Sequence, residues 1–532
     1  MSADNQDGVR PPRDGSRRTA AIAGVVAAFT GLAAGHLVAG LVSPEASPAL
    51  AVGSSLIDLA PTPVKEWAVA TLGSNDKPVL VAGVVIVTLL LGGLTGWLAV
   101  RRRRLIWAGP ALLGLIGVTA AVAGSPDPLA TLFALISETS SAAGVAGLLA
   151  ALPSVIAAAA SAATLWWFLP RPRRDSDGAP RALPRRAFLT GTAVAGASGA
   201  LALLTGQWLA VRSRVATDVI LPAPSPSAAP PLTAGLDVPG LSPWVTPNAD
   251  FYRVDINLLV PTVDVAGWQL RVDGLVERPL RLTWADLTAL PVVERDITLN
   301  CVSNEVGGPY IGGARWLGVR TRDLLERAGV RPEADQVLSR SVDGFTVSTP
   351  VQALLDDRDA LIAIGMNGRP LPVEHGFPAR LITPGLYGYV GATKWLTQLV
   401  LTTYAKDAAY WTVRGWAEHG PVKPSSRIDV PRGLSRVPAG EVIVAGTAWA
   451  QHIGVARVQL RVDGGAWQET TIGPDAGIDY WRQWRFPWRA TSGEHTLESR
   501  VIDDSGTPQS ELVAPPFPDG ASGLHKITVH VT

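Results

Sequence analysis

The sequence contains few cysteines, methionines, histidines and charged residues for its length. Of 532 residues, one is cysteine, two are methionine and seven are histidine, and charged residues make up 17%. A single cysteine excludes an intramolecular disulfide, so disulfide use says nothing about the compartment. The histidines show no metal-ligand spacing. The formal net charge is +1, which lacks the basic excess expected of a nucleic-acid-binding protein, and we expect no nucleic-acid partner.

The scarcity of charge is concentrated between residues 19 and 210, where Ala, Gly, Val and Leu dominate. A hydrocarbon core of ~30 Å is crossed by roughly 20 residues of helix. Apolar stretches of about that length predict an all-α transmembrane bundle of about five spans, preceded by a cytoplasmic tail at 1–18. We expect the spans near 19–42, 79–100, 105–123, 142–169 and 187–210.

Basic residues predict the orientation of these spans. Arg17 and Arg18 precede the first span, a run of arginines at 101–104 joins the second to the third, and further arginines fill 171–186. The loops at 43–78 and 124–141, which alternate with these arginine-rich segments along the chain, hold few basic residues. By the positive-inside rule the N-terminus is cytoplasmic, and everything after about 211 is extracytoplasmic.

The fifth span begins with Arg185-Arg186-Ala187-Phe188-Leu189 and an Ala/Gly-rich run. This resembles a twin-arginine export signal placed internally; ordinary positive-inside charge is the alternative interpretation. Only His36 lies within a predicted span, whereas a haem b usually needs two axial histidines, so we expect no haem. A Pro/Ser-rich linker follows at 211–247.

From residue 248 the pattern is that of a soluble protein. Short alternating strands and short helices without βαβ alternation predict an α+β domain at 248–432. The segments 292–300 and 321–328 are expected as a strand and a helix, and Asn367-Gly368 as a hairpin turn. Residues 433–532 form a second unit, where regularly spaced alternating strands predict an immunoglobulin-like β-sandwich.

The single cysteine lies at the predicted end of the strand 292–300, in LNCVSNEVGG at 299–308. A lone cysteine is more often a small buried hydrophobe than a ligand. The glycine-rich loop that follows Cys301 favours a functional role for the cysteine. Such a loop can bring backbone N–H groups and a thiolate close to a bulky anionic ligand.

Five motifs in order make the region 243–532 similar to the sulfite-oxidase family of molybdopterin-dependent oxidoreductases. They are TPNADFYR at 246–253, the Cys301 segment, MNGRPLPVEHGFPAR at 366–380, GATKWL at 391–396, and the sandwich motifs GTAW at 446–449 and RVDGGAW at 461–467. The resemblance implies an α+β molybdopterin-binding domain followed by a sandwich of the dimerisation type, and thus a possible homodimer.

The resemblance also implies a molybdenum–molybdopterin cofactor and its contacts. Cys301 stands where the family has its metal ligand, and a thiolate is a suitably soft ligand beside the dithiolene. Arg253 stands where the family has an arginine that reaches the metal centre, so Cys301 and Arg253 are the expected catalytic residues. The residues expected to bind the cofactor are Phe251, Tyr252, Arg253, Cys301, Asp343, His375, Arg380, Ala392, Thr393 and Lys394.

Two departures from the family concern the substrate. Sulfite oxidases place an arginine pair shortly after the cysteine, where this chain has Glu305 and Val306, and the family's active-site tyrosine falls near Val413. A pocket with fewer cations binds a dianion less well, which predicts weak sulfite oxidation and better activity on a neutral or zwitterionic substrate such as a sulfoxide. The direction of the reaction, sulfite-type oxidation or reduction of an S-oxide or N-oxide, stays open. The alternative is that Glu305 faces solvent or pairs with Arg315 or Arg253.

The sequence therefore predicts a membrane-anchored molybdenum oxidoreductase that transfers oxygen atoms outside the cytoplasmic membrane. We expect its redox partner to be a cytochrome or a quinone in or at the membrane. An alternative is that the spans themselves form a quinone-dependent electron-transfer module. The alternative is a non-catalytic membrane-tethered binding module on the same scaffold. Cys301 argues against that alternative, since a scaffold without the metal has no chemical need for a thiol there.

Overall fold

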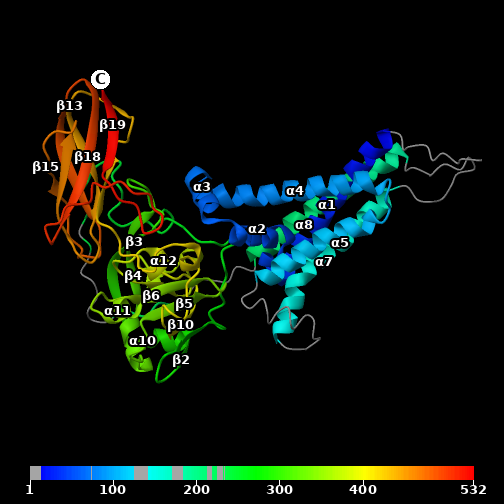
Figure 1. The fold of residues 1–532 in the computed structure, drawn as a ribbon, viewed down its shortest axis with the longest axis horizontal. Helices are drawn as coiled ribbons and strands as arrows, with labels where there is room; N and C mark the ends of the chain where they lie inside the picture. The colour runs from blue at the N-terminus through cyan, green and yellow to red at the C-terminus, as the bar shows by residue number, and fades with distance from the viewer. Residues whose placement is uncertain are drawn as a thin grey trace, which may run out of the picture. The chain divides into compact units, whose positions relative to one another are not determined.

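A computed structural model describes residues 14–72, 75–124, 142–169, 184–212, 219–224, 232 and 234–532 (Figure 1). The chain divides into two compact units. The helical unit comprises Met1–Arg214 with Ile256–Leu259, and the β-rich unit comprises Val215–Asp255 with Val260–Thr532. Residues 213–218, 225–231 and 233 of the predicted linker and the loop 125–141 lie outside the described residues.

The helical unit confirms the predicted spans. Five helices within the described residues are long and apolar enough to cross a membrane. They are α1 (Asp14–Val42), α4 (Asp76–Ala99), α5 (Leu105–Ala123), α7 (Ala142–Phe168) and α8 (Arg185–Arg212). Between α1 and α4 the chain forms a 3-10 turn, η1 (Pro44–Ala46), and two short helices that were not predicted, α2 (Pro48–Leu59) and α3 (Thr62–Leu72).

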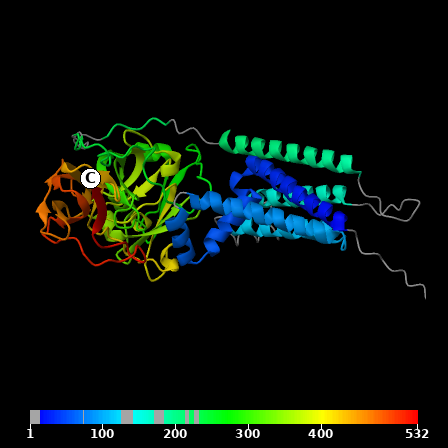
Figure 2. The ribbon, with the colours of Figure 1, turned by 90° about the horizontal axis from the view of Figure 1, so that it is seen from above.

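Small residues set the packing inside the helical unit. Helix α1 contacts α4, α7 and α8, and the long helices run side by side in Figure 2. A Cβ atom added at Gly96 would lie 2.1 Å from Ala20 O, and one added at Gly24 would lie 2.1 Å from Gly92 O. The backbones of α1 and α4 are therefore in direct contact, as small residues allow in membrane helix pairs.

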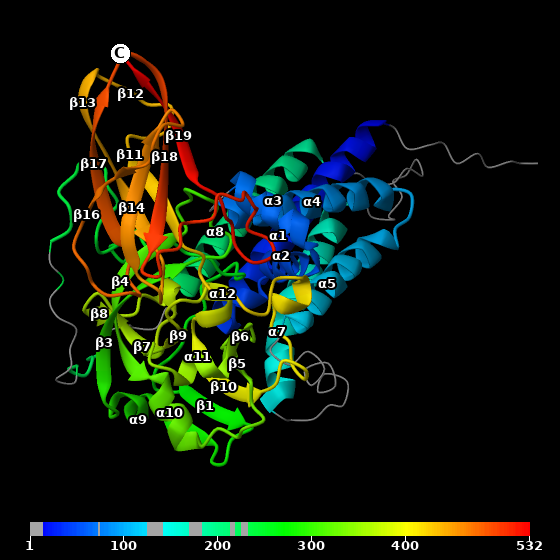
Figure 3. The same ribbon diagram turned by 60° about the vertical axis from the view of Figure 1, so that its left-hand side comes forward.

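The first part of the β-rich unit contains two sheets, visible in Figure 3. One has the order β2-β1-β10-β5-β6 and the other β3-β4-β7-β8, with β9 also paired to β7. Their strands are β1 (Gln269–Gly274), β2 (Leu280–Thr283), β3 (Val292–Asn300), β4 (Ile311–Arg320), β5 (Gln336–Ser341), β6 (Thr346–Pro350), β7 (Leu361–Met366), β8 (Arg369–Pro370), β9 (Arg380–Ile382) and β10 (Leu396–Thr402). Only β1 and β10 pair in parallel among these strands, which confirms the α+β class.

The helices of this part are short and begin and end at predictable signals. They are α9 (Trp284–Thr288), α10 (Thr321–Ala328), α11 (Val351–Leu355), α12 (Gly388–Gly391) and the 3-10 turns η3 (Val373–His375) and η4 (Thr412–Arg414). A capping box joins Thr283 and Asp286 at the start of α9. Asn367 and Gly368 both have positive φ and join β7 to β8, as a type I′ hairpin requires.

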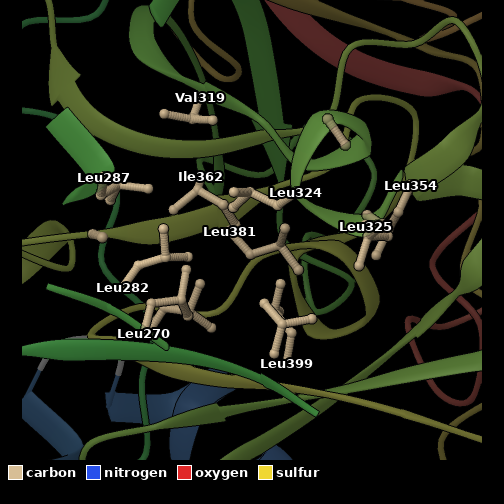
Figure 4. Close-up of a cluster of buried hydrophobic side chains, with 14 of the residues drawn as sticks. Leu270, Leu282, Leu287, Val319, Leu324, Leu325, Leu354, Ile362, Leu381 and Leu399 are labelled. Atoms are coloured by element: carbon tan, nitrogen blue, oxygen red, sulfur yellow. The ribbon is translucent and has the colours of Figure 1, made fainter. Parts of the chain in front are cut away.

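The hydrophobic core of this part draws side chains from both sheets and from α10. Leu270 of β1, Leu399 of β10, Ile362 of β7 and Leu324 of α10 are all fully buried in one cluster (Figure 4). Burial of such apolar surface drives folding of this region. The core thereby fixes the strands whose ends carry the candidate site.

The second part of the β-rich unit is a sandwich of two sheets, as predicted. Their orders are β11-β13-β17-β16 and β12-β19-β18-β14-β15. The strands are β11 (Ser425–Val430), β12 (Arg436–Val437), β13 (Gly440–Trp449), β14 (Val455–Val462), β15 (Gln468–Glu469), β16 (Thr471–Ile472), β17 (Arg482–Ala490), β18 (Gly493–Asp503) and β19 (His525–Val531). Strand β11 pairs with β13, so the sheet includes residues that precede position 433.

Candidate functional site

Cys301 directly follows β3, at the start of a tight loop that leads into β4. Its backbone N–H donates to Tyr310 O at 3.0 Å, and Asn304 N–H donates to Cys301 O at 3.1 Å. The thiol lies 2.9 Å from the Ser303 hydroxyl. Burial raises the pKa of the Cys301 thiol, while the hydrogen bond from Ser303 and the charge of Lys394 act in the opposite direction. An approaching cation or metal would favour the thiolate further.

Arg380 places a buried cation at the start of β9. It is 6% exposed, its Nη1 donates to His375 O at 3.0 Å, and its guanidinium lies 5.2 Å from the centre of the Trp316 ring. Its Nε is buried without a hydrogen-bond partner, and among the described residues no carboxylate pairs with it. Burial lowers the pKa of Arg380 to about 10. A buried cation without an anion is costly, which indicates that an anionic ligand belongs here.

His375 lies beside Arg380 and is held in one tautomer. Its Nε2 lies 3.0 Å from Asn248 O; because a carbonyl oxygen only accepts, Nε2 carries the proton and Nδ1 is an acceptor. Burial, followed by the charge of Arg380, lowers the pKa of His375 to about 4. The imidazole is therefore neutral, and its ring meets Phe251 edge-on at 5.6 Å.

Lys394 and Arg253 share one carboxylate. The Lys394 Nζ lies 2.8 Å from Asp255 Oδ2, and the Arg253 Nε lies 2.7 Å from the same oxygen. Burial lowers the pKa of Lys394 to about 8, although Asp255 opposes the shift. The Arg253 side chain is 36% exposed and that of Asp255 is 4% exposed. Of Lys394, Asp255 and Arg253, Arg253 is thus the residue nearest the surface. The structure records no contact between Arg253 and Cys301.

Two tyrosines lie within electrostatic range of Cys301. Burial and the charge of a Cys301 thiolate raise the pKa of Tyr252 well above its usual range, with Arg380 opposing. The Tyr252 ring stacks on Phe251 at 5.3 Å between ring centres. Burial raises the pKa of Tyr387 to about 12, and Cys301 contributes. Both hydroxyls stay protonated near neutral pH and can act as donors. Tyr387 was not predicted, because its place beside Cys301 depends on the fold.

Asp343, Ala392 and Thr393 make local contacts. Asp343 Oδ1 accepts the Phe345 N–H at 3.0 Å within the β5–β6 turn. The Thr393 hydroxyl is buried and lies 2.6 Å from Ser339 Oγ, and Ala392 N–H caps α12 at Gly388 O. These bonds fix the loops on which the three residues lie. Their contact with a cofactor stays a prediction.

Of the residues that depart from the family pattern, Glu305 and Val413 lie at the surface and Val306 is half-buried. Glu305 is exposed, and Val413 is 65% exposed on η4. Arg315 pairs with Asp296 at 2.7 Å, and Arg253 pairs with Asp255, so the structure records no pairing of either arginine with Glu305. Water screens an exposed carboxylate, which reduces its effect on a bound anion.

Comparisons with known proteins support the resemblance to molybdopterin-dependent oxidoreductases. Residues 257–411 match the family described as "Oxidoreductase molybdopterin binding domain". Mitochondrial sulfite oxidase of Rattus norvegicus is 30% identical over 321 residues, covering 51% of this chain and 58% of that protein. The uncharacterized oxidoreductase YuiH of Bacillus subtilis (strain 168) is 35% identical over 157 residues, covering 30% of this chain and 76% of that protein.

Among solved structures, the sulfane dehydrogenase SoxCD from Paracoccus pantotrophus covers 53% of this chain and 80% of its own, at a TM-score of 0.47 and 23% identity. The chain spans little more than half of the length of the rat sulfite oxidase, 58%.

Proposed function

The chain belongs to the sulfite-oxidase family of molybdopterin-dependent oxidoreductases, and from that premise we propose that it catalyses two-electron oxygen-atom transfer on a small substrate. The observation that carries the proposal is the buried Arg380, which has no carboxylate partner among the described residues. Arg380 and the Cys301 thiol both lie within electrostatic range of Tyr252. A non-catalytic module would use such a cation to bind an anionic ligand, but it has no chemical need for the thiol of Cys301. An enzyme that binds an anionic, thiolate-ligated cofactor uses both.

The residues present fit a molybdenum–molybdopterin cofactor. Arg380 and Lys394 offer the cations that a phosphate requires, and His375 adds a neutral imidazole with a free acceptor at Nδ1. Cys301 offers a soft sulfur ligand. Lys394 is already bound to Asp255, so a phosphate that used Lys394 would share it with this carboxylate.

When bound, the cofactor would supply the redox and oxygen-transfer chemistry. The chain's own residues would hold and polarise the reactants. Cys301 would act as a thiolate, favoured by Ser303 and Lys394. Tyr252, whose raised pKa keeps it protonated, would donate a hydrogen bond to an oxygen atom on the substrate. Arg253 would orient a substrate that approaches from the surface, since its side chain is partly exposed.

For the substrate, we propose a neutral or zwitterionic oxide, such as a sulfoxide, in preference to sulfite. The loop after Cys301 offers Glu305 and Val306 in place of an arginine pair. Loss of a partly desolvated cation costs about 2–5 kcal/mol of anion binding. Because Glu305 is exposed, we attribute the expected weak binding of sulfite to the missing cations and not to the charge of the carboxylate.

Steady-state kinetics of the purified full chain test this substrate preference. We expect kcat/KM for a sulfoxide, with a reduced dye as electron donor, to exceed that for sulfite with an oxidised dye. Arg253→Ala should lower both, and Arg369→Ala, at an exposed position, should lower neither. Efficient sulfite turnover that Arg253→Ala leaves unchanged would contradict the proposal.

We further propose that the helical unit anchors the enzyme in the cytoplasmic membrane with the β-rich unit outside. The basic loops at 17–18, 101–104 and 185–186 support this orientation. The electron partner would be a cytochrome or quinone at the membrane, and the sandwich would serve a homodimer. Added protease should digest the β-rich unit in spheroplasts, and replacing Arg185 and Arg186 by Lys should retain it inside. Digestion only after lysis would reverse the orientation.

A further inference from the structure

The sandwich contacts the chain on both sides of Cys301. On the N-terminal side it binds Thr298 in β3, three residues before the cysteine. Thr298 N–H donates to Asp479 O at 2.9 Å, Trp481 N–H donates to the Thr298 hydroxyl at 2.9 Å, and Gln451 Nε2 donates to Thr298 O at 2.7 Å. Since β3 is the edge strand of its sheet, the sandwich satisfies the backbone groups that this edge leaves open.

On the C-terminal side the sandwich holds the glycine loop that follows Cys301. Arg427 Nη1 donates to Gly308 O at 2.7 Å. The same guanidinium pairs with Asp429 at 2.7 Å and donates to Ser242 Oγ at 2.9 Å, so its direction is fixed. Arg427 is 8% exposed, and a charged donor that is buried from solvent makes a strong hydrogen bond.

Gly307 meets a second sandwich residue, His525. A Cβ atom added at Gly307 would lie 2.2 Å from His525 Cδ2 and 2.3 Å from His525 Nε2. The His525 ring is held in turn by Ile428 N–H, which donates to Nδ1 at 2.9 Å. Burial and the charge of Arg427 lower the pKa of His525 to about 4, so the ring is neutral. The His525 ring is therefore fixed in place and packs against the backbone of the loop at Gly307.

We propose that Arg427 and His525 are positioning residues of the candidate metal site, which set the path of the loop 301–308 and with it the position of the Cys301 thiol. The sandwich is then a part of the site and not only a surface for dimerisation. The inference rests on the proposed function only in naming a metal as the ligand of Cys301. The placement of the thiol by Arg427 and His525 is a separate claim, and it can be tested without the cofactor.

Cys301 is the one cysteine of the chain, so a small neutral thiol reagent reports on it alone. We would label the full-length chain, purified without cofactor, at one fixed pH. Arg427→Gln removes the bond to Gly308 and should change the labelling rate about tenfold or more, as expected when a buried charged hydrogen bond is lost. The matched control is Arg457→Gln, whose exposed side chain pairs with Glu469 in the same sandwich; its rate should stay within about twofold of wild type.

The contact of Gly307 with His525 gives a second test, which also serves if Arg427→Gln does not fold. Gly307→Ala should change the labelling rate, and adding His525→Ala should return it to the rate of His525→Ala alone, because contacting residues are non-additive. Gly464→Ala controls for the strain of alanine at positive φ, since Gly464 has φ 68° and no neighbour within 4 Å. His530→Ala, on the same strand as His525, controls for loss of a histidine.

Cofactor-loaded protein supplies a readout that a general loss of stability would not move. At equal molybdenum content, Arg427→Gln and the Gly307→Ala single variant should alter the electron paramagnetic resonance signal of the metal, and the control variants should not. Labelling rates and signals that match wild type in folded Arg427→Gln and Gly307→Ala would overturn the inference. A chain that binds no molybdenum would refute the proposed function, and the labelling result would still decide whether Arg427 and His525 position the thiol.

Discussion

The two units of the molecule achieve close packing by opposite means. In the helical unit, glycine and alanine lie between helices, whereas large apolar side chains such as Leu90 (66% exposed) and Trp107 (59%) face outward. In the β-rich unit the largest side chains, Trp316 and Trp484 among them, are fully buried. Water drives burial of large apolar groups in the β-rich unit. The packing of the helical unit is the one expected of helices in lipid, which gives no such drive and favours close backbone contact. The comparison predicts different sensitivities to mutation.

The largest expected effect on stability is at Trp316. The side chain is fully buried, donates from Nε1 to Ile297 O at 3.1 Å and lies beneath Arg380. Trp316→Ala should lower the free energy of unfolding of the β-rich unit by about 3–5 kcal/mol, measured by denaturant unfolding. Trp467→Ala, whose ring stacks on the side chains of Arg461 and Arg500, is the control and should cost less. Equal losses would contradict the account of the core.

Arg380→Gln should have opposite effects on the empty and the loaded protein. Removing the buried, unpaired cation should stabilise the cofactor-free chain against unfolding. The same change should weaken cofactor retention by about 2–5 kcal/mol, measured as molybdenum lost on dialysis. Arg369→Gln, at an exposed position, should change neither quantity. Destabilisation of the cofactor-free chain by Arg380→Gln would show that the guanidinium has a structural role instead.

In the helical unit the sensitive positions are glycines. Gly96→Leu would drive its side chain into the Ala20 carbonyl, whereas a Cβ atom added at Gly83 on the same helix has no neighbour within 4 Å. We expect Gly96→Leu to lower the melting temperature of the full chain in detergent, at a cost of about 1–3 kcal/mol. Gly83→Leu should have no effect. Similar melting temperatures for both variants would refute close packing of α1 on α4.

The sequence predicts more of the fold than of the site. Apolar length predicts the five spans, and alternation predicts the sandwich strands, because each depends on local pattern. Helices α2 and α3 were missed because they are shorter than a span. The ion pair of Lys394 with Asp255 joins residues separated by 139 positions, which no local pattern reveals. The packing of His525 against Gly307 likewise forms only when the sandwich folds.

Lys394 predicts a pH dependence of anion binding in the β-rich unit. The pKa of Lys394 is lowered to about 8, so the cation is fully present only well below pH 8 and is lost as pH rises through that value. A phosphate-bearing ligand favours the protonated form, so cofactor affinity should fall above about pH 8. Lys394→Arg keeps its charge and should remove the fall. If cofactor affinity still falls above about pH 8 in Lys394→Arg, the titration of another group causes the fall.

The smallest expected effect is at Glu305. Because its carboxylate is exposed, Glu305→Gln should raise kcat/KM for sulfite by less than about threefold. Asp357→Gln, at another exposed carboxylate, should leave kcat/KM unchanged. A gain of a hundredfold or so would show that Glu305 reaches the bound substrate after all.

The central claim is that this chain holds a molybdenum cofactor through Cys301, and metal and pterin analysis tests it most directly. Full-length protein made with its cofactor supply intact should contain about one molybdenum and one pterin per chain. Cys301→Ala should lose at least the metal, because we propose the Cys301 thiolate as its protein ligand. Cys301→Ala should keep the wild-type circular dichroism spectrum, which separates loss of the ligand from loss of the fold. Folded wild-type protein without molybdenum, or a Cys301→Ala variant that holds as much metal as wild type, would contradict the account.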